Sequence, residues 1–181
     1  MTNAHRTARP RSGRLLRVIA GILIGAGVLL AVVAVVAPER VERAYGATKS
    51  TVDAIAAGVR ATVLDELPRA RLGATGGKAE LSRCDDTFTQ MASYTRAGVP
   101  PVWAAHNNCG GDVILNWQLG DHVILSTAQG DVEYEVVEVR HVPKTWSSTD
   151  DLLGLDGDLA LQTCLYGQDI MDFVGLDRVG D

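Results

Sequence analysis

Hydrophobic residues are unevenly distributed along the 181-residue chain, and the first block of them is one uninterrupted run. Residues 18–37 read VIAGILIGAGVLLAVVAVVA and contain no charge. A helix of that length, at ~1.5 Å per residue, spans the ~30 Å hydrocarbon layer of a membrane. The run therefore predicts a transmembrane anchor. A cleaved signal peptide is the alternative, because small residues end the run at Ala34 and Ala37, although a signal h-region usually has only ~7–15 residues.

The charges around this run predict its orientation. Residues 1–17 carry five arginines and no acid, for a net charge of +5, whereas both signs are mixed just after the run. An excess of positive charge before the span keeps that end in the cytoplasm. We expect a cytoplasmic basic tail at 1–17 and a single-pass anchor at 18–37 in the cell membrane. The remaining chain then lies outside the cell.

A weaker helical pattern follows, from Pro38 to about Leu67. Apolar residues recur there at steps of three and four, which is typical of one helical face. They are Val41, Tyr45, Val52, Ile55, Val59 and Val63, with Thr48 in the same row. We expect a helix that lies against its own domain or the membrane surface; a coiled-coil dimer is the alternative. Pro68 ends it, and the glycine-rich Leu72–Lys78 (LGATGGK) predicts a flexible linker, so that residues 38–78 form a helical stalk and linker.

Beyond residue 79 the apolar period becomes that of strands. In residues 132–136 (VEYEV) valine and tyrosine alternate with glutamate, as a half-buried antiparallel strand requires. Glycine-aspartate turn signals at 120–121 and 130–131 separate further short extended segments. Residues 81–95 predict a helix instead. The pattern indicates an all-β domain at 79–181, a small barrel or sandwich with one or two short helices.

Composition restricts what this domain binds. Residues 79–181 carry five basic and seventeen acidic groups, for a net charge of −12, although the whole chain carries only −5. So acidic a domain repels phosphate backbones, which argues against nucleic-acid binding. Four of the acids, Asp150, Asp151, Asp156 and Asp158, form what we interpret as a solvated loop, with a calcium site as the alternative. Three cysteines are too few for a disulfide-stapled miniprotein, and the odd number leaves at least one unpaired within the chain.

Cys164 is the first candidate for chemistry, because it directly follows the apolar strand 159–163 (LALQT). A cysteine at a strand end can present its sulfur at the rim of a barrel. To act as a nucleophile it needs a nearby cation or imidazolium that favours the thiolate. His106 follows the apolar run Val102–Ala105 and opens a polar loop. It is the best-placed histidine, because the others beyond the basic tail lie within predicted strands.

These segments, in their order along the chain, resemble the sortases, which are membrane-anchored cysteine transpeptidases of Gram-positive bacteria. The resemblance rests on Ala104-Ala105-His106, 119–125 (LGDHVIL), 134–137 (YEVV) and 159–164 (LALQTC). The resemblance covers about residues 99–179. Within the family, this chain is similar to a reduced, class E/F-like form from actinobacteria. Ala105 stands where the family has Gly, and Ala160 stands where it has the first Thr of TLxTC. The resemblance implies a small sortase-like β-barrel.

The resemblance also implies roles for individual residues. Cys164 is the nucleophile, and His106 exchanges protons with the leaving and incoming amines. The family's third residue is an arginine on the strand after the cysteine. Arg178 lies on that predicted strand, and Arg140 is the reserve candidate. Thr163 and Ala105, next to the two reactive residues, are expected to bind the substrate, and no cofactor is implied.

The chain between the predicted linker and His106 is shorter than in the family. Fewer than thirty residues lie there, where sortases usually have several strands. We therefore expect a barrel that is trimmed, or that is completed in another way, for instance by a helix that covers an open edge.

Cys84 and Cys109 are the remaining cysteines. Two spare thiols in an exported domain are more often joined than free. A bond between them would enclose about 25 residues and contribute roughly 3 kcal/mol in the loop-entropy model. It would also tie the N-terminal part of the domain to the loop that carries His106. The alternative is a metal site formed by His106, Cys109, Asp112 and His122.

The predicted function is thiol transpeptidation on a sorting signal. The resemblance implies that Cys164 attacks an LPxTG-like peptide, holds it as a thioester and passes it to an amine of a cell-wall precursor or a pilin lysine. The expected partners are this peptide, the amine acceptor and, through the anchor, membrane lipid. One alternative is a catalytically silent sortase-like binding or structural module, which a buried Cys164 out of reach of His106 would favour. The other is a cysteine hydrolase without transfer activity.

Overall fold

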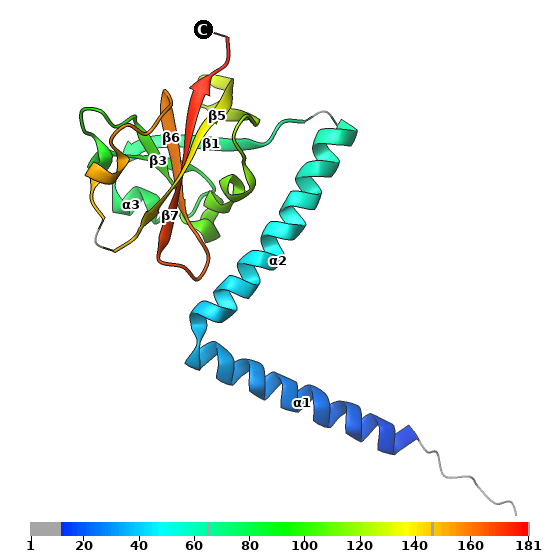
Figure 1. Cartoon of the computed structure of the whole chain (residues 1–181). Helices are drawn as coiled ribbons and strands as arrows, with labels where there is room; N and C mark the ends of the chain where they lie inside the picture. Colours follow the sequence, from blue (N-terminus) through cyan, green and yellow to red (C-terminus); the bar gives the residue numbers. More distant parts are fainter. Residues whose placement is uncertain (1–11, 65, 146, 181) are drawn as a thin grey trace, which may run out of the picture. The chain divides into compact units, whose positions relative to one another are not determined.

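The computed structural model describes residues 12–64, 66–145 and 147–180 (Figure 1). It divides into two compact units, Met1–Val41 and Glu42–Asp181. Helix α1 (Ser12–Val36) contains the long apolar run, and its side chains from Leu16 onward are exposed. The stretch Leu16–Val36 is long and apolar enough to cross a membrane. Residues 1–11 of the predicted basic tail lie outside the described residues.

Helix α2 (Pro38–Val59) begins where the apolar run ends. A proline suits a first helical position, because its missing N–H would have no partner there in any case. A short π-helical segment, Arg60–Leu64, follows. The helix predicted after the apolar run is therefore present.

Most of the apolar stripe of α2 does not lie on the face that packs. Val52, Ile55 and Val59 are each more than half exposed. The helix buries Gly46 instead, and a Cβ atom at that position would lie 2.5 Å from the Cβ of Tyr166. Only a glycine allows the helix to approach Tyr166 so closely. The helix packs on its own domain, through a face that the periodicity did not indicate.

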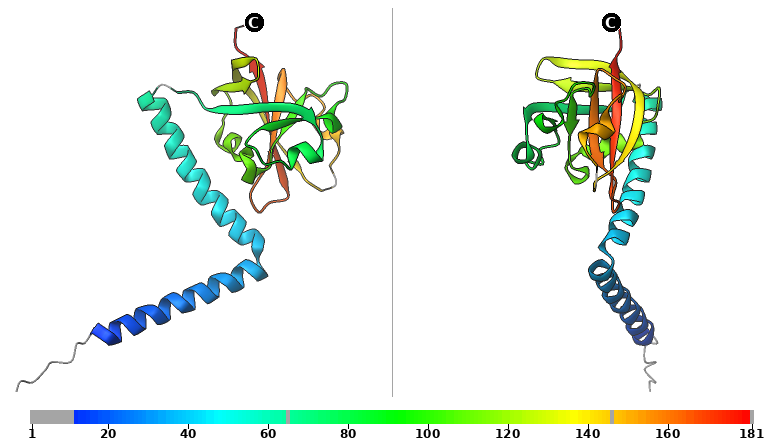
Figure 2. Two further views of the ribbon diagram at one scale, coloured as in Figure 1. Left: turned by 180° about the vertical axis from the view of Figure 1, so that it is seen from behind. Right: turned by 60° about the vertical axis from the view of Figure 1, so that its left-hand side comes forward.

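Within the described residues, Glu42–Asp181 contains a closed seven-stranded barrel with the order β1-β2-β3-β6-β7-β5-β4 (Figures 1 and 2). The strands are β1 (Arg69–Gly76), β2 (Phe88–Met91), β3 (Val102–Ala104), β4 (His122–Thr127), β5 (Gly130–Pro143), β6 (Leu159–Cys164) and β7 (Ile170–Arg178). Strand β1 pairs in parallel with both β2 and β4, and β3 pairs in parallel with β6. The remaining pairs are antiparallel. The predicted all-β barrel is confirmed.

Two predictions about the start of the barrel are wrong. The stretch Leu72–Lys78, predicted as a linker, belongs mostly to β1. The stretch Leu81–Thr95, predicted as a helix, contains β2 and the 3₁₀ turn η2 (Ala92–Tyr94), and the α-helix in this region is the short α3 (Lys78–Leu81). Backbone pairing on both sides of β1 outweighs the poor strand propensity of its glycines. The barrel is therefore closed by strands and not by a helix that covers an open edge, and its first strand begins at Arg69, before residue 79.

Side chains of β6 and β7 alternate between two hydrophobic clusters. The barrel interior contains Leu159, Leu161, Val174, Leu176 and Val136. The outer face contains Val102, Ala160, Phe173, Leu152 and Leu155, the last two from the segment that includes the 3₁₀ turn η5 (Thr149–Leu152). Cys164 follows Ala160 and Gln162 in the alternation and therefore belongs to the outer face.

Candidate functional site

The strand register brings Cys164 and His106 to the same end of the barrel. Cys164 is the last residue of β6, and His106 lies two residues beyond the end of β3. These strands are parallel neighbours in which Ala104 lies opposite Gln162, so Cys164 and His106 each follow that pair by two residues. His106 is exposed and Cys164 is half-buried. A half-buried thiol and an exposed imidazole thus lie at the ends of adjacent strands, an arrangement that thiol chemistry requires.

Thr163 and Ala105 join the two strands just before the reactive residues. The Thr163 hydroxyl donates to the Ala105 carbonyl at 3.0 Å, and the Ala105 N–H donates to the Gln162 carbonyl at 3.0 Å. Thr163 is fully buried and Ala105 is 4% exposed. The prediction that these side chains bind substrate does not agree with their burial. Their hydrogen bonds fix the distance between the two chain segments that carry Cys164 and His106.

The loop after His106 is fixed from several sides. The backbone N–H groups of Cys109 and Gly111 donate to the His106 carbonyl at 2.9 and 3.0 Å. Cys109 forms a disulfide with Cys84, with a Cα–Cα distance of 4.7 Å, which ties this loop to the segment between α3 and β2. A Cβ atom on Gly111 would lie 2.5 Å from the Thr163 Oγ1, so glycine is required there. The backbone that carries His106 is therefore closely restrained.

Neither alternative metal site agrees with the structure. Cys109 of the first alternative is bonded to Cys84 and cannot be a thiolate ligand. In the acidic segment before β6, Asp151 and Asp158 each accept a hydrogen bond from a backbone N–H, and Asp150 pairs with Arg96. Among the described residues, no group of three or more His, Cys, Asp or Glu side chains could hold a metal ion.

Arg178, the predicted third catalytic residue, lies at the other end of the barrel. Cys164 is opposite Met171 at the start of β7, and Arg178 is opposite Tyr134 at its end. Seven residues of extended strand separate Met171 from Arg178, about 23 Å at ~3.3 Å per residue. The prediction is wrong because the turn between β6 and β7 is short, so β7 has already carried the chain away when Arg178 is reached.

Arg140, the reserve candidate, has its donors engaged elsewhere. Its Nε donates to Glu138 at 2.6 Å, and its two terminal nitrogens donate to the carbonyls of Leu153 (3.2 Å) and Gly154 (2.9 Å). These bonds hold the segment before β6 against β5. Arg140 is therefore a structural residue of the outer face.

Two polar side chains near Cys164 were missed by the sequence reasoning. The buried Gln162 places Nε2 3.9 Å from the Cys164 Sγ. The Tyr94 Oη lies 4.0 Å from the Sδ of Met171, which is the strand partner of Cys164. Gln162 could have been found, because it precedes the cysteine by two residues on one face of a strand. Tyr94 could not, because its segment was assigned to a helix.

A buried carboxylate lies on β7 next to the strand partner of Cys164. Asp172 is opposite Thr163 on β6 and His141 on β5. It is 3% exposed, and its Oδ1 has no hydrogen-bond partner although the His141 Nε2 lies 3.2 Å away. Burial raises the pKa of Asp172, and the nearby His141 opposes this rise. Incompletely satisfied buried acids of this kind cluster at functional sites.

Tyr166 lies in the turn between β6 and β7, just after Cys164. It connects this turn, the cysteine loop, with the histidine loop, which begins at His106. Its hydroxyl lies 2.8 Å from the Asp112 carboxylate and 3.0 Å from the Asn107 carbonyl. From α2, Lys49 pairs with Asp112 at 2.6 Å, and Tyr45 packs edge-on against the Tyr166 ring at a centroid distance of 5.6 Å. Burial, followed by the hydrogen bond to Asp112, raises the pKa of Tyr166, so its hydroxyl remains a donor.

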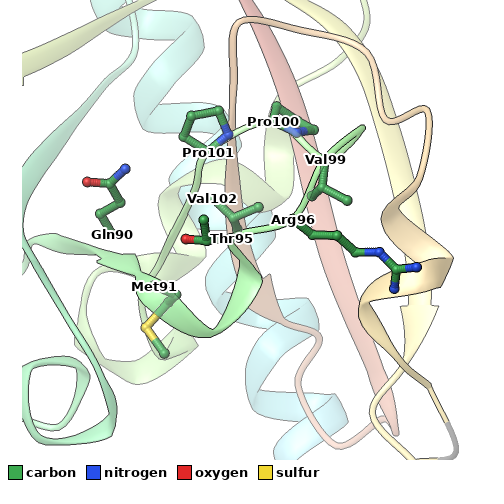
Figure 3. A pocket seen from close by; sticks show the side chains of 8 residues that line it. All are labelled: Gln90, Met91, Thr95, Arg96, Val99, Pro100, Pro101 and Val102. Atoms are coloured by element: carbon green, nitrogen blue, oxygen red, sulfur yellow. The ribbon is translucent and has the colours of Figure 1, made fainter.

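A pocket of about 140 Å³ adjoins β3 (Figure 3). It is lined by Gln90, Met91, Thr95, Arg96, Val99, Pro100, Pro101 and Val102. The Arg96 side chain extends away from the other lining residues and is paired with Asp150. Val102 lies opposite Ala160, four residues before Cys164 on β6, or about 13 Å along the strand.

No protein-family model and no curated protein matches the sequence. Solved structures that are similar include sortase C from Clostridium perfringens SM101 (19% identity, TM-score 0.44, 61% of this chain and 63% of that one). They also include sortase C1 of GBS pilus island 1 (15%, 0.46, 59% and 57%) and a lid mutant of sortase A from Corynebacterium diphtheriae (17%, 0.45, 61% and 64%). The match spans less than two thirds of each of these chains. All three are sortases, the family that the sequence motifs resemble.

Proposed function

We propose that this protein is a membrane-anchored cysteine transpeptidase of the sortase type, which forms a thioester on Cys164. The observation that supports this most is the pairing of β3 with β6, which puts His106 and Cys164 at one end of a closed barrel. The partial exposure of Cys164 argues against a silent module, for which a buried thiol would be expected.

The chemistry follows from these two side chains. The Cys164 thiolate attacks the carbonyl carbon of the scissile peptide bond, a C–S bond forms, and the carbonyl π electrons move to the oxygen. When the oxyanion collapses, the C–N bond breaks and His106 gives a proton to the departing amine. The thioester remains. His106 then takes a proton from an incoming amine, which attacks the thioester and releases Cys164.

The substrate in this proposal is a sorting-signal peptide of the LPxTG type, lying extended along β3. The pocket at Val102 and the Cys164 end of β6 are about 13 Å apart, or about four residues of extended chain. Four residues also run from the leucine of such a motif to its threonine carbonyl. The apolar lining residues, among them Met91 and Val99, suit an aliphatic side chain.

The cellular setting is part of the same proposal. Helix α1 would hold the protein in the cell membrane as a single-pass anchor, with the basic N-terminal tail in the cytoplasm and the barrel outside. The amine acceptor would then be a cell-wall precursor or a pilin lysine. An oxidising exterior is consistent with the Cys84–Cys109 disulfide.

A Cys164→Ala variant tests the proposal. The full chain in detergent is incubated with an LPxTG peptide, with and without triglycine as amine, and followed by mass spectrometry. We expect an acyl adduct on Cys164 of the parent, a transfer product with triglycine, and neither with the variant. If Cys164→Ala cleaves as fast as the parent, Cys164 is not the nucleophile. Cleavage by the parent without a triglycine product at any concentration would establish a hydrolase.

A further inference from the structure

Neither arginine expected from the resemblance is placed to donate to the oxyanion. A negative charge develops on the carbonyl oxygen when Cys164 attacks, and catalysis requires hydrogen-bond donors aimed at it. On the strand after Cys164, the residue opposite it is Met171. Arg178 is at the far end of that strand, and the donors of Arg140 are engaged by Glu138 and loop carbonyls. A side chain from an element other than β5 or β7 is therefore the candidate donor.

Gln162 supplies one N–H group beside the sulfur. Its Nε2 donates to the Thr163 carbonyl at 2.7 Å, which fixes the amide with nitrogen toward that side. The same nitrogen lies 3.9 Å from the Cys164 Sγ. An amide nitrogen carries two hydrogens, so one remains for the sulfur. Gln162 is only 7% exposed, so this donor is rigidly placed and shielded from water.

Tyr94 supplies a hydroxyl on the same outer face. Its ring packs edge-on against Phe173, with centroids 5.9 Å apart, and its Oη lies 4.0 Å from the Met171 Sδ. Because Met171 is the strand partner of Cys164, the hydroxyl lies at the cysteine end of this face. A thioether is a weak acceptor, so the hydroxyl proton is available to a stronger one.

The ionisation of Tyr94 agrees with a donor role. Burial is the main cause that raises the pKa of Tyr94, and the negative charge of a Cys164 thiolate raises it further. The phenol therefore keeps its proton while Cys164 is ionised. A neutral donor beside a nucleophilic thiolate is the arrangement that oxyanion stabilisation needs.

We propose that Tyr94 is a catalytic residue whose hydroxyl donates a hydrogen bond to the oxyanion formed when Cys164 attacks, while the Gln162 amide holds the sulfur. In sortases, which the sequence resembles, this role belongs to an arginine; here the neutral side chain of Tyr94, from η2, takes it. During attack the C–S bond forms and the carbonyl electron pair moves to the oxygen, which accepts from Tyr94. When the C–N bond breaks, the carbonyl is restored, and the proton of Tyr94 has not been transferred. The inference rests on the function proposed above.

Two reactions of the same thiol separate this role from a structural one. Acylation by p-nitrophenyl acetate passes through an oxyanion, whereas alkylation by iodoacetamide does not. In the full chain we expect Tyr94→Phe to slow acylation of Cys164 by about 100-fold, the usual effect of removing one oxyanion donor. Alkylation should stay within about twofold of the parent, because thiolate formation does not need this hydroxyl. Tyr134→Phe, the same substitution near the other end of β7, is the matched control and should change neither rate.

The outcomes distinguish this inference from the proposed function. Acylation of Tyr94→Phe within about threefold of the parent would overturn the role of Tyr94, since loss of a donor costs more than that. An equal fall in acylation and alkylation would also overturn it, because the hydroxyl would then only support the structure. The two reagents need no sorting peptide. If the parent reacts with both but never cleaves an LPxTG peptide, the proposed substrate fails while the Tyr94 assignment stands.

Discussion

The two ends of the β6–β7 pair are built from the same strands but bury different groups. At the end that holds Arg178, Leu159 faces Leu176 in the core, and the exposed Asp158 accepts the Arg178 backbone N–H. At the end that holds Cys164, the strands bury the polar Thr163 and the incompletely bonded Asp172. Buried polar groups lower stability unless they are satisfied. The buried polar groups of this strand pair thus gather at the end that the proposed function makes the active site.

The largest effect that separates the two ends concerns His106 and Arg178. His106→Ala should lower kcat/KM for peptide cleavage by about 100-fold or more, because general acid–base catalysis is lost. Arg178→Ala should stay within about threefold, since removal of an exposed side chain has little effect. Steady-state assays with the LPxTG peptide compare the two. A loss for Arg178→Ala as large as that for His106→Ala would contradict the register described here.

The Cys84–Cys109 disulfide, which restrains the loop after His106, should contribute to the stability of the protein. Reducing Cys84–Cys109, or replacing both residues by serine, should lower the free energy of unfolding by about 2–4 kcal/mol. The His106 loop should loosen with it, so acylation should slow as well. Thermal melts with and without a phosphine reductant measure the first effect. The double serine variant is the control, and a reductant effect on its melting temperature would show that the disulfide is not the cause.

Tyr166 should give a smaller change. Tyr166→Phe removes the hydroxyl that bonds to Asp112 and Asn107, which we expect to cost about 1 kcal/mol. Tyr45→Phe is the matched control, because its described contact with Tyr166 is made by the ring, and it should leave the melting temperature unchanged. Equal melting temperatures for both variants would mean that the bridge between the cysteine and histidine loops contributes nothing.

Replacing Asp172 should have the smallest effect on the free energy of unfolding, and it should raise this free energy where the substitutions above lower it. Its folded pKa is raised, so its contribution to stability is complete below the unfolded value of about 3.9 and is lost as the pH rises through the folded value. Asp172→Asn should therefore stabilise the protein at pH 7 by about 1 kcal/mol or less, and this gain should vanish in acid. Denaturant unfolding at several pH values measures it.

Asp131 is the matched control for that variant, because its pKa is lowered by the Ser126 hydroxyl and by Arg69. Asp131→Asn should slightly destabilise the protein at neutral pH. If both substitutions change stability in the same direction, burial of Asp172 does not act as described.

The strand pattern in the second half of the chain was predictable, and the reason is physical. Residues 132–136 alternate because Tyr134 and Val136 pack against the core while Glu135 between them is exposed. The β1 strand was missed because its sequence, RARLGATG, has no such alternation and is held by pairing with two distant strands. The helix assigned to 81–95 failed because Phe88 and Met91 have a helical spacing that β2 also accommodates.

The sequence indicated Cys164 and His106, which lie at one end of the barrel, but it did not indicate the side chains around them. Cys164 and His106 were identifiable because each follows an apolar strand. Arg178 was assigned by counting residues, and a count does not reveal how short the preceding turn is. Tyr94 lies near Cys164 because of the conformation of η2, and no local sequence pattern predicts that conformation. Neighbours that arrive from distant segments depend on tertiary structure, and a sequence read by itself does not place them.

The position of β7 in the barrel has a consequence for biogenesis. This strand, the last in the described chain, lies between β5 and β6 and forms the backbone pairs that join them. Because the chain is made from its N-terminal side, β1 to β6 would be exposed before their sheet can close. The barrel would then assemble in one late, cooperative step. Until that step chaperones would have to shield its unpaired edges. A truncation that removes part of β7 should therefore open the barrel, whereas removal of the residues before Arg69 leaves every strand in place.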